Sequence, residues 1–152
     1  MVVERIFVSE VAKGRLIERD SVVAVAGLGI VGDRYFGCDD SPGRNITLIE
    51  AEEIESFLGG FGRPPGLSIS RRNLVTRGVR LNRLVGREFM VGDVRLRGAE
   101  LCEPCRILGA ALAGPTLPAE EAVKRFLHRA GLRADVLSNG TIARGDAIRR
   151  VV

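Results

Sequence analysis

Short apolar runs separated by glycine-containing turns are the feature that most limits how this chain can fold. Valine-rich runs at residues 2–8 and 22–25, and an apolar run at 46–49, are typical of buried or half-buried strands. Between the second and third runs, residues 27–34 bring three glycines close together, which favours a turn over a regular element. The first third of the chain therefore predicts a sheet.

The second half of the chain continues this pattern. Residues 89–97 predict a hairpin, because Gly92 and Asp93 separate two apolar runs and arginines alternate with apolar residues after the turn. Residues 135–143 and 147–152 predict the last two strands. The sheet should therefore draw strands from both halves of the sequence.

Two segments have helical spacing instead. Residues 50–58 carry apolar side chains at helical intervals and are followed by two glycines, which end helices. A second helix is expected after Pro115 and Pro118, with Gly131 closing it. Many short strands with two helices predict a mainly β, barrel-like fold rather than alternating β–α units. The length of 152 residues fits one domain, so we expect residues 1–152 to form a single unit.

Composition restricts the classes of partner. The net charge is +4, and the only lysines are Lys13 and Lys124, so arginine carries almost all of the positive charge. Arginine binds phosphate through paired, rigidly placed donors, which is compatible with an anionic ligand. The arginines are scattered, tryptophan is absent and Tyr35 is the only tyrosine, which argues against a nucleic-acid partner.

The sequence also indicates where the chain functions. It contains no apolar run of membrane-spanning length, and its first residues lack the pattern of a secretory signal, so we expect no membrane partner. Three cysteines are too few, and odd in number, for a disulfide framework, and they suit a reducing compartment. A cytoplasmic location is expected.

The most informative local motif contains Cys102 and Cys105, with Pro104 between them and Arg106 after them. A thiol on a stiff turn beside a cation is suited to act as a metal ligand or a nucleophile. The spacing also occurs in dithiol oxidoreductases, but their order of parallel strands and helices is missing here. A zinc site from the three cysteines and His128 is disfavoured, since structural zinc usually uses two compact ligand pairs. A buried, inert thiol is the alternative for Cys105.

A charged triplet, Arg71-Arg72-Asn73, interrupts residues 67–76, which are otherwise expected to be mostly extended. Arg71 offers paired charged donors and Asn73 offers both a donor and an acceptor, as a phosphate and a heterocycle edge require. In an extended backbone Arg72 would point to the opposite side. Arg34 could line the same pocket, although ordinary turn chemistry accounts for its segment. From spacing alone, a solvated arginine face with a turn-stabilising asparagine is the simpler explanation.

Taken in order, these motifs resemble the MOSC domain, the molybdenum cofactor sulfurase C-terminal family. The resemblance covers roughly residues 20 to 150 and depends on the combination of motifs more than on any one of them. The matching stretches are Gly32-Asp33-Arg34, Ile46-Thr47-Leu48, Arg71-Arg72-Asn73-Leu74-Val75, Leu84-Val85-Gly86-Arg87, Gly92-Asp93-Val94 and Glu103-Pro104-Cys105.

The resemblance implies a β-rich fold that binds the molybdenum cofactor, a pterin dithiolene with a terminal phosphate. In the reductases of this family, a cysteine at the position of Cys105 gives its thiolate to molybdenum. The residues aligned with Arg71 and Asn73 contact the cofactor. Cys105 is therefore the expected catalytic residue and metal ligand, and Arg71, Asn73 and Cys105 form the expected cofactor site.

Three functions are compatible with these residues. The first is an oxidoreductase that reduces N-hydroxylated or N-oxide compounds, such as amidoximes or hydroxylaminopurines, with an external electron-transfer protein as partner. The second is a module that delivers the cofactor or carries sulfur as a persulfide on Cys105. The third is a sensor of pterin or nucleotide phosphate without chemistry of its own.

Overall fold

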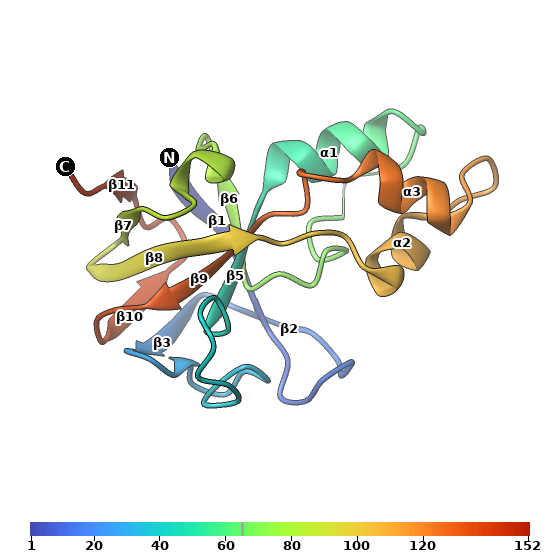
Figure 1. Cartoon of the computed structure of the whole chain (residues 1–152). Helices are drawn as coiled ribbons and strands as arrows, with labels where there is room; N and C mark the ends of the chain where they lie inside the picture. The colour runs from blue at the N-terminus through green and yellow to red at the C-terminus, as the bar shows by residue number, and fades with distance from the viewer. Residues whose placement is uncertain (65) are drawn as a thin grey trace.

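The computed structural model describes residues 1–64 and 66–152, and within them the chain forms an eight-stranded and a three-stranded sheet (Figure 1). The larger sheet has the order β11-β7-β8-β9-β5-β6-β1-β2, and only its β5–β6 pair is parallel. Its strands are β1 (Val2–Val8), β2 (Ile17–Arg19), β5 (Ile46–Glu50), β6 (Leu74–Arg77), β7 (Glu88–Val91), β8 (Val94–Leu101), β9 (Leu132–Val136) and β11 (Ile148–Arg150). The smaller sheet contains β3 (Ser21–Val25), β4 (Gly29–Ile30) and β10 (Gly140–Ala143). The larger sheet curls into a half-barrel, which confirms the mainly β, barrel-like prediction.

Three α-helices lie together at one end of the molecule, and the smaller sheet lies toward the other (Figure 1). They are α1 (Ala51–Gly59), α2 (Arg106–Leu112) and α3 (Ala119–Arg125), and a 3₁₀ turn, η1 (Leu81–Leu84), follows β6. Helix α1 confirms the helix expected at residues 50–58. None of the helices in the described part of the chain is long and apolar enough to cross a membrane.

The core has two parts because the central strand β5 is buried on both faces of the sheet: Leu48 belongs to one apolar cluster and Ile49 to the other. Strand β8, nearer the edge, buries only one face, since Val94 and Leu96 are buried whereas Arg95 and Arg97 are exposed. A second apolar cluster fills the space between the sheet and the helices. There the ring of Phe57 in α1 packs edge-on against the ring of Phe126, with the ring centroids 5.2 Å apart. The helical end is thus fixed to the sheet by its own apolar layer.

Helix α2 was not expected from the sequence. It has only seven residues, too few to show a helical period, and it packs against α3 at Gly109, where a Cβ would lie 2.5 Å from Val123 Cγ2. The Arg63 guanidinium donates to the carbonyl oxygens of Leu112 at 2.6 Å and Ala111 at 3.3 Å. Tertiary contacts therefore stabilise this short helix, and Cys105 is the residue immediately before it.

The structure corrects three expected elements. Only Leu74–Arg77 of the stretch 67–76 is a strand, because residues 67–70 form a turn. The strand expected at 135–143 is two strands, since the chain leaves β9 after Val136 and Asn139 accepts the Ala26 N–H at 2.8 Å before β10 begins. The second predicted helix ends at Arg125 and continues as turns, not a helix, toward Gly131. Pro65, within a loop expected at residues 64–66, lies outside the described residues.

Burial of Glu50 gives the fold a pH dependence. This carboxyl group, 5% exposed, accepts the Leu81 N–H at 2.8 Å, and burial raises its pKa above the ordinary 4.5. The folded protein therefore binds the proton more tightly than the unfolded chain, so this group's contribution to stability decreases as pH rises from about 4.5 through the raised pKa. We expect Glu50→Gln to remove that decrease. Urea unfolding of the wild type and of Glu50→Gln across this pH range measures the free energy of unfolding. Parallel curves of that free energy against pH would contradict the assignment to Glu50.

Candidate functional site

A cavity of about 580 Å³ lies between the strands and helix α2. Four separate segments of the chain form its walls, and the segments come from before β2, after β4, before β6 and the start of α2. The lining residues are Ala12, Lys13, Arg34, Tyr35, Cys38, Ile69, Ser70, Arg71, Arg72, Cys105, Ile107, Leu108 and Ala111.

The structure separates the two cysteines of the Cys102–Cys105 motif. Cys105 is exposed and lines the cavity, whereas Cys102 is fully buried at the end of β8, where its N–H donates to the Gly131 carbonyl at 2.8 Å. Burial raises the pKa of the Cys102 thiol, which keeps it protonated and unreactive. All three cysteines are free thiols. The described residues contain no cluster of three or more ligands that could hold a metal, so the structure gives no support to the four-ligand zinc alternative.

This separation predicts selective alkylation. In the folded protein, iodoacetamide is expected to modify the exposed thiols Cys38 and Cys105 and to leave Cys102 unmodified, because Cys102 is both inaccessible and protonated. Peptide mass spectrometry of native and urea-denatured samples measures the modification at each cysteine. The denatured sample is the control, since all three thiols should react there. Modification of Cys102 as fast as Cys105 in the native state would contradict the structure.

Arg71 lines the cavity with an unusual backbone. Its φ of 60° lies in the left-handed region, and its Nη2 donates to the Gly14 carbonyl at 2.7 Å. Arg72 also lines the cavity and donates through Nε to the Ala130 carbonyl at 3.0 Å. The expectation that Arg72 points away was wrong, because a left-handed residue before it abolishes the side-to-side alternation of an extended strand.

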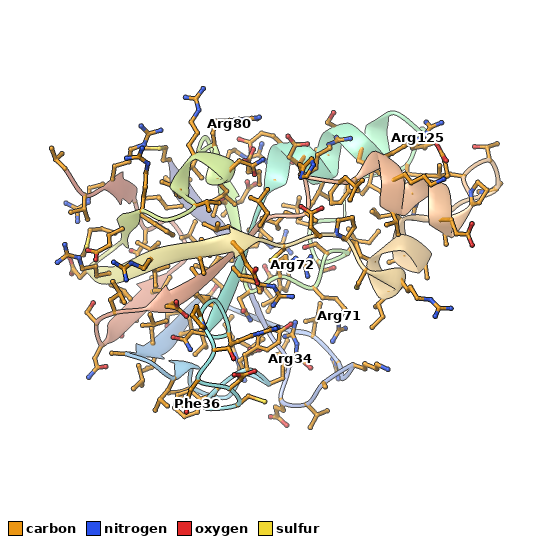
Figure 2. The ribbon with its side chains drawn as sticks, viewed as in Figure 1. Arg34, Phe36, Arg71, Arg72, Arg80 and Arg125 are labelled. Atoms are coloured by element: carbon orange, nitrogen blue, oxygen red, sulfur yellow. The ribbon has the colours of Figure 1, made fainter. Side chains whose placement is uncertain are left out.

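Arg34 is a further cation in the cavity, one that turn chemistry alone would not identify. Its Nη2 donates to the Arg71 carbonyl at 2.7 Å, its Nη1 lies 3.1 Å from Asp33 Oδ1, and its guanidinium carbon lies 4.5 Å from the centre of the Tyr35 ring. Figure 2 shows Arg34, Arg71 and Arg72 in one region between the strands and helix α2, whereas Arg80 and Arg125 lie on the opposite side of the molecule. The motifs alone left Arg34 as one possible residue of the pocket.

Asn73 does not share the cavity wall. Its side chain is fully buried: Nδ2 donates to the Phe7 carbonyl at 3.1 Å, and Oδ1 accepts from the Thr47 N–H at 3.1 Å and from Thr47 Oγ1 at 3.2 Å. The amide thus connects β1 and β5 to the start of β6. These bonds use the donor and the acceptor that the amide could otherwise offer to a ligand. In this structure Asn73 fixes the base of the segment that carries Arg71.

The cavity combines three kinds of surface. Four cationic side chains line it, Lys13, Arg34, Arg71 and Arg72, and within the described part of the chain no aspartate or glutamate does. Apolar side chains from α2 and from Ile69 form another part of the wall. Cys105 adds an exposed thiol. Such a cavity is suited to a ligand with an anionic group, an apolar body and an atom that accepts a sulfur ligand.

His128 lies outside this arrangement. It follows α3 with a φ of 61°, its side chain is 74% exposed, and its Nδ1 lies 3.1 Å from Glu103 Oε1. His128 is therefore solvated and lies in the turn that follows the helix.

Comparison with solved structures finds the same fold in several bacterial proteins. The YuaD protein from Bacillus subtilis superposes with a TM-score of 0.80 at 21% identity, over 96% of this chain and 92% of that one. YiiM from Geobacillus stearothermophilus gives 0.71 at 19% identity, over 99% and 75% of the two chains. YiiM from Escherichia coli gives 0.71 at 15% identity, over 100% and 70%. A comparison with curated proteins found no match.

The sequence profile of the MOSC domain matches residues 37–149, well over half of the chain. This range contains Arg71, Arg72 and Cys105. The structural superpositions with YuaD and with YiiM from Geobacillus stearothermophilus cover 96% and 99% of the chain, so the shared fold also includes nearly all residues outside this range. The chain therefore belongs to the MOSC domain family.

Proposed function

We propose that this protein binds the molybdenum cofactor in the cationic cavity and reduces N-hydroxylated or N-oxide compounds with electrons from an external electron-transfer protein. The observation that carries the proposal is that Cys105 and Arg71 line one cavity in a MOSC domain. These residues are separated by more than thirty positions in the sequence, so only the fold brings them to the same wall.

The cavity residues fit the chemistry of this cofactor. Molybdenum bound to dithiolene sulfur is soft and favours a further thiolate ligand, which exposed Cys105 can supply. The terminal phosphate requires charge-assisted donors, and four cations line the cavity. The flat pterin ring requires an apolar surface, which α2 and Ile69 provide.

Each residue then has a defined part. Cys105 would hold the metal, Arg71 the phosphate, and buried Asn73 would act indirectly by fixing the segment that carries Arg71. The apolar side chains of α2 would limit the access of water to the substrate position. When bound, the cofactor supplies the two-electron redox chemistry, and the protein supplies orientation and charge.

Purification from cells that make the cofactor tests this proposal directly. We expect molybdenum by elemental analysis and pterin by fluorescence after oxidation, in comparable amounts. Protein from cells that cannot make the cofactor is the control and should contain neither. Absence of both from the test sample, under several growth conditions, would contradict the proposal.

A second candidate function is transfer of sulfur, or of the cofactor itself, to another protein. The exposure of Cys105 favours it, because a persulfide carrier requires an accessible thiol. After incubation with a sulfur donor, mass spectrometry should then find an added sulfur atom on Cys105. Reductase turnover without added sulfur would exclude the sulfur carrier. The third candidate, a phosphate sensor, requires that Cys105→Ala keep its full biological effect.

A further inference from the structure

Arg34 is a cation of the cavity that the fold encloses closely. Its side chain is only 9% exposed, and the Asp33 side chain beside it is not exposed at all. Nη1 of the guanidinium lies 3.1 Å from Asp33 Oδ1, Nη2 donates to the Arg71 carbonyl at 2.7 Å, and the group lies over the Tyr35 ring. Both terminal nitrogens are therefore engaged with protein groups.

Asp33 is fixed in turn by the backbone around it. Its Oδ1 accepts the Ser9 N–H at 3.0 Å and its Oδ2 accepts the Tyr35 N–H at 3.2 Å. The Arg34 N–H donates to the Ser9 carbonyl at 2.7 Å. The carboxylate and guanidinium thus form a buried pair whose position depends on β1 and the turn after β4, not on a bound molecule.

Arg71, by contrast, occupies a backbone conformation that is unfavourable for a residue with a side chain. Its φ is 60°, and left-handed backbone persists at such residues only where the surroundings enforce it. Three contacts hold the residue: its N–H donates to the Ser68 carbonyl at 3.0 Å, its carbonyl accepts from Arg34 Nη2 at 2.7 Å, and its own Nη2 donates to the Gly14 carbonyl at 2.7 Å. The direction of the Arg71 guanidinium therefore depends on the loop that carries Arg34 and on the loop that carries Gly14.

We propose that Arg34 is a positioning residue that holds Arg71 in its left-handed conformation and so directs the Arg71 guanidinium into the cavity. The inference rests on the proposed function, in which Arg71 binds the phosphate of the ligand. It adds that the Asp33–Arg34 pair determines the geometry of that phosphate site.

Crystal structures of Arg34→Gln and of a matched control, Arg44→Gln, test the positioning directly. Arg44 is an exposed arginine on the same loop, 4.0 Å from Asp39. In Arg34→Gln we expect residue 71 to leave the positive-φ region and to lose its contact with Gly14, while Arg44→Gln leaves both unchanged. An unchanged Arg71 in Arg34→Gln would overturn the proposal.

If Arg34→Gln does not fold, Arg34→Lys takes its place. A lysine that still contacts the Arg71 carbonyl should coincide with a positive φ at residue 71, and a lysine turned away should coincide with a displaced Arg71. Arg71 in its present conformation beside a lysine turned away would overturn the proposal.

Binding of inorganic pyrophosphate, measured by isothermal titration calorimetry, provides the second readout. We expect about tenfold weaker binding to Arg34→Gln, corresponding to one charge-assisted hydrogen bond, and unchanged binding to Arg44→Gln. Weaker binding while Arg71 stays in place would mean that Arg34 contacts the anion itself, and would overturn the positioning role. If the wild type binds no pyrophosphate while Arg71 moves as expected, the positioning role holds and the phosphate assignment of the proposed function fails.

Discussion

Replacing Cys105 with serine is expected to lower the molybdenum content of the purified protein by about tenfold or more, because a neutral hydroxyl is a poor ligand for a soft metal centre. The substitution is nearly isosteric and lies at an exposed position, so the fold should be unaffected. Pterin content should decrease together with the metal, because the metal–sulfur bond is one of the attachments that hold the whole cofactor. Elemental and pterin analysis of both proteins from the same expression host measures the change.

Cys38→Ser is the matched control for this experiment, because Cys38 is an exposed thiol that lines the same cavity. Its molybdenum content should equal that of the wild type. If only Cys38→Ser lost molybdenum, Cys38 would be the ligand instead of Cys105. If both variants kept their full molybdenum content, neither cysteine would be a ligand. The pair thus distinguishes the identity of the sulfur ligand from the presence of the cofactor.

Gly131→Ala is expected to destabilise the fold by more than about 3 kcal/mol, since the new side chain meets rigid backbone at a strained position. Gly131 has a φ of 103°, and a Cβ there would lie 1.9 Å from the Leu48 carbonyl oxygen and 3.0 Å from its carbon. Strand β5, which contains Leu48, is central in the sheet and cannot move without separating from β6 or β9. Urea unfolding followed by circular dichroism measures the loss.

The control for this prediction is Gly59→Ala. Gly59 is the last residue of α1, its φ is not positive, and nothing lies within 4 Å of a Cβ at that position. Alanine favours helix over glycine, so stability should change by less than about 1 kcal/mol or increase. Equal stabilities of the two variants would mean that β5 can move away from Gly131, contrary to the packing described above.

Local patterns predicted the elements whose side chains alternate or repeat within a few residues. The β7–β8 hairpin followed from Gly92-Asp93 and the alternating residues after it, and α1 followed from its apolar spacing. Helix α2 could not be predicted in this way, because its stability depends on Arg63 and on contact with α3 through Gly109. Arg63 is far from α2 in the sequence, and glycine, as at Gly109, normally disfavours a helix.

The site was predictable only in part, for a related reason. The motifs identified Cys105 and Arg71, and both line the cavity. The inclusion of Arg72 depends on a left-handed backbone at Arg71, and few sequence patterns indicate a positive φ at a residue other than glycine. Asn73 was predicted to contact a ligand but does not line the cavity. An amide that can bind a ligand can equally well join strands, and the burial of Asn73 shows that it joins strands.

The four segments that form the cavity wall begin near residue 12 and end near residue 111, with no two of them adjacent in sequence. A ligand that contacts all of them is therefore bound only by the fully assembled chain, and local opening of any one segment weakens its hold. By thermodynamic linkage, a ligand that binds only the folded chain raises the free energy of unfolding, by an amount that grows with the ligand concentration relative to its Kd. Loss of the ligand in the cell would consequently appear first as faster turnover of the protein, before any change in its folded architecture.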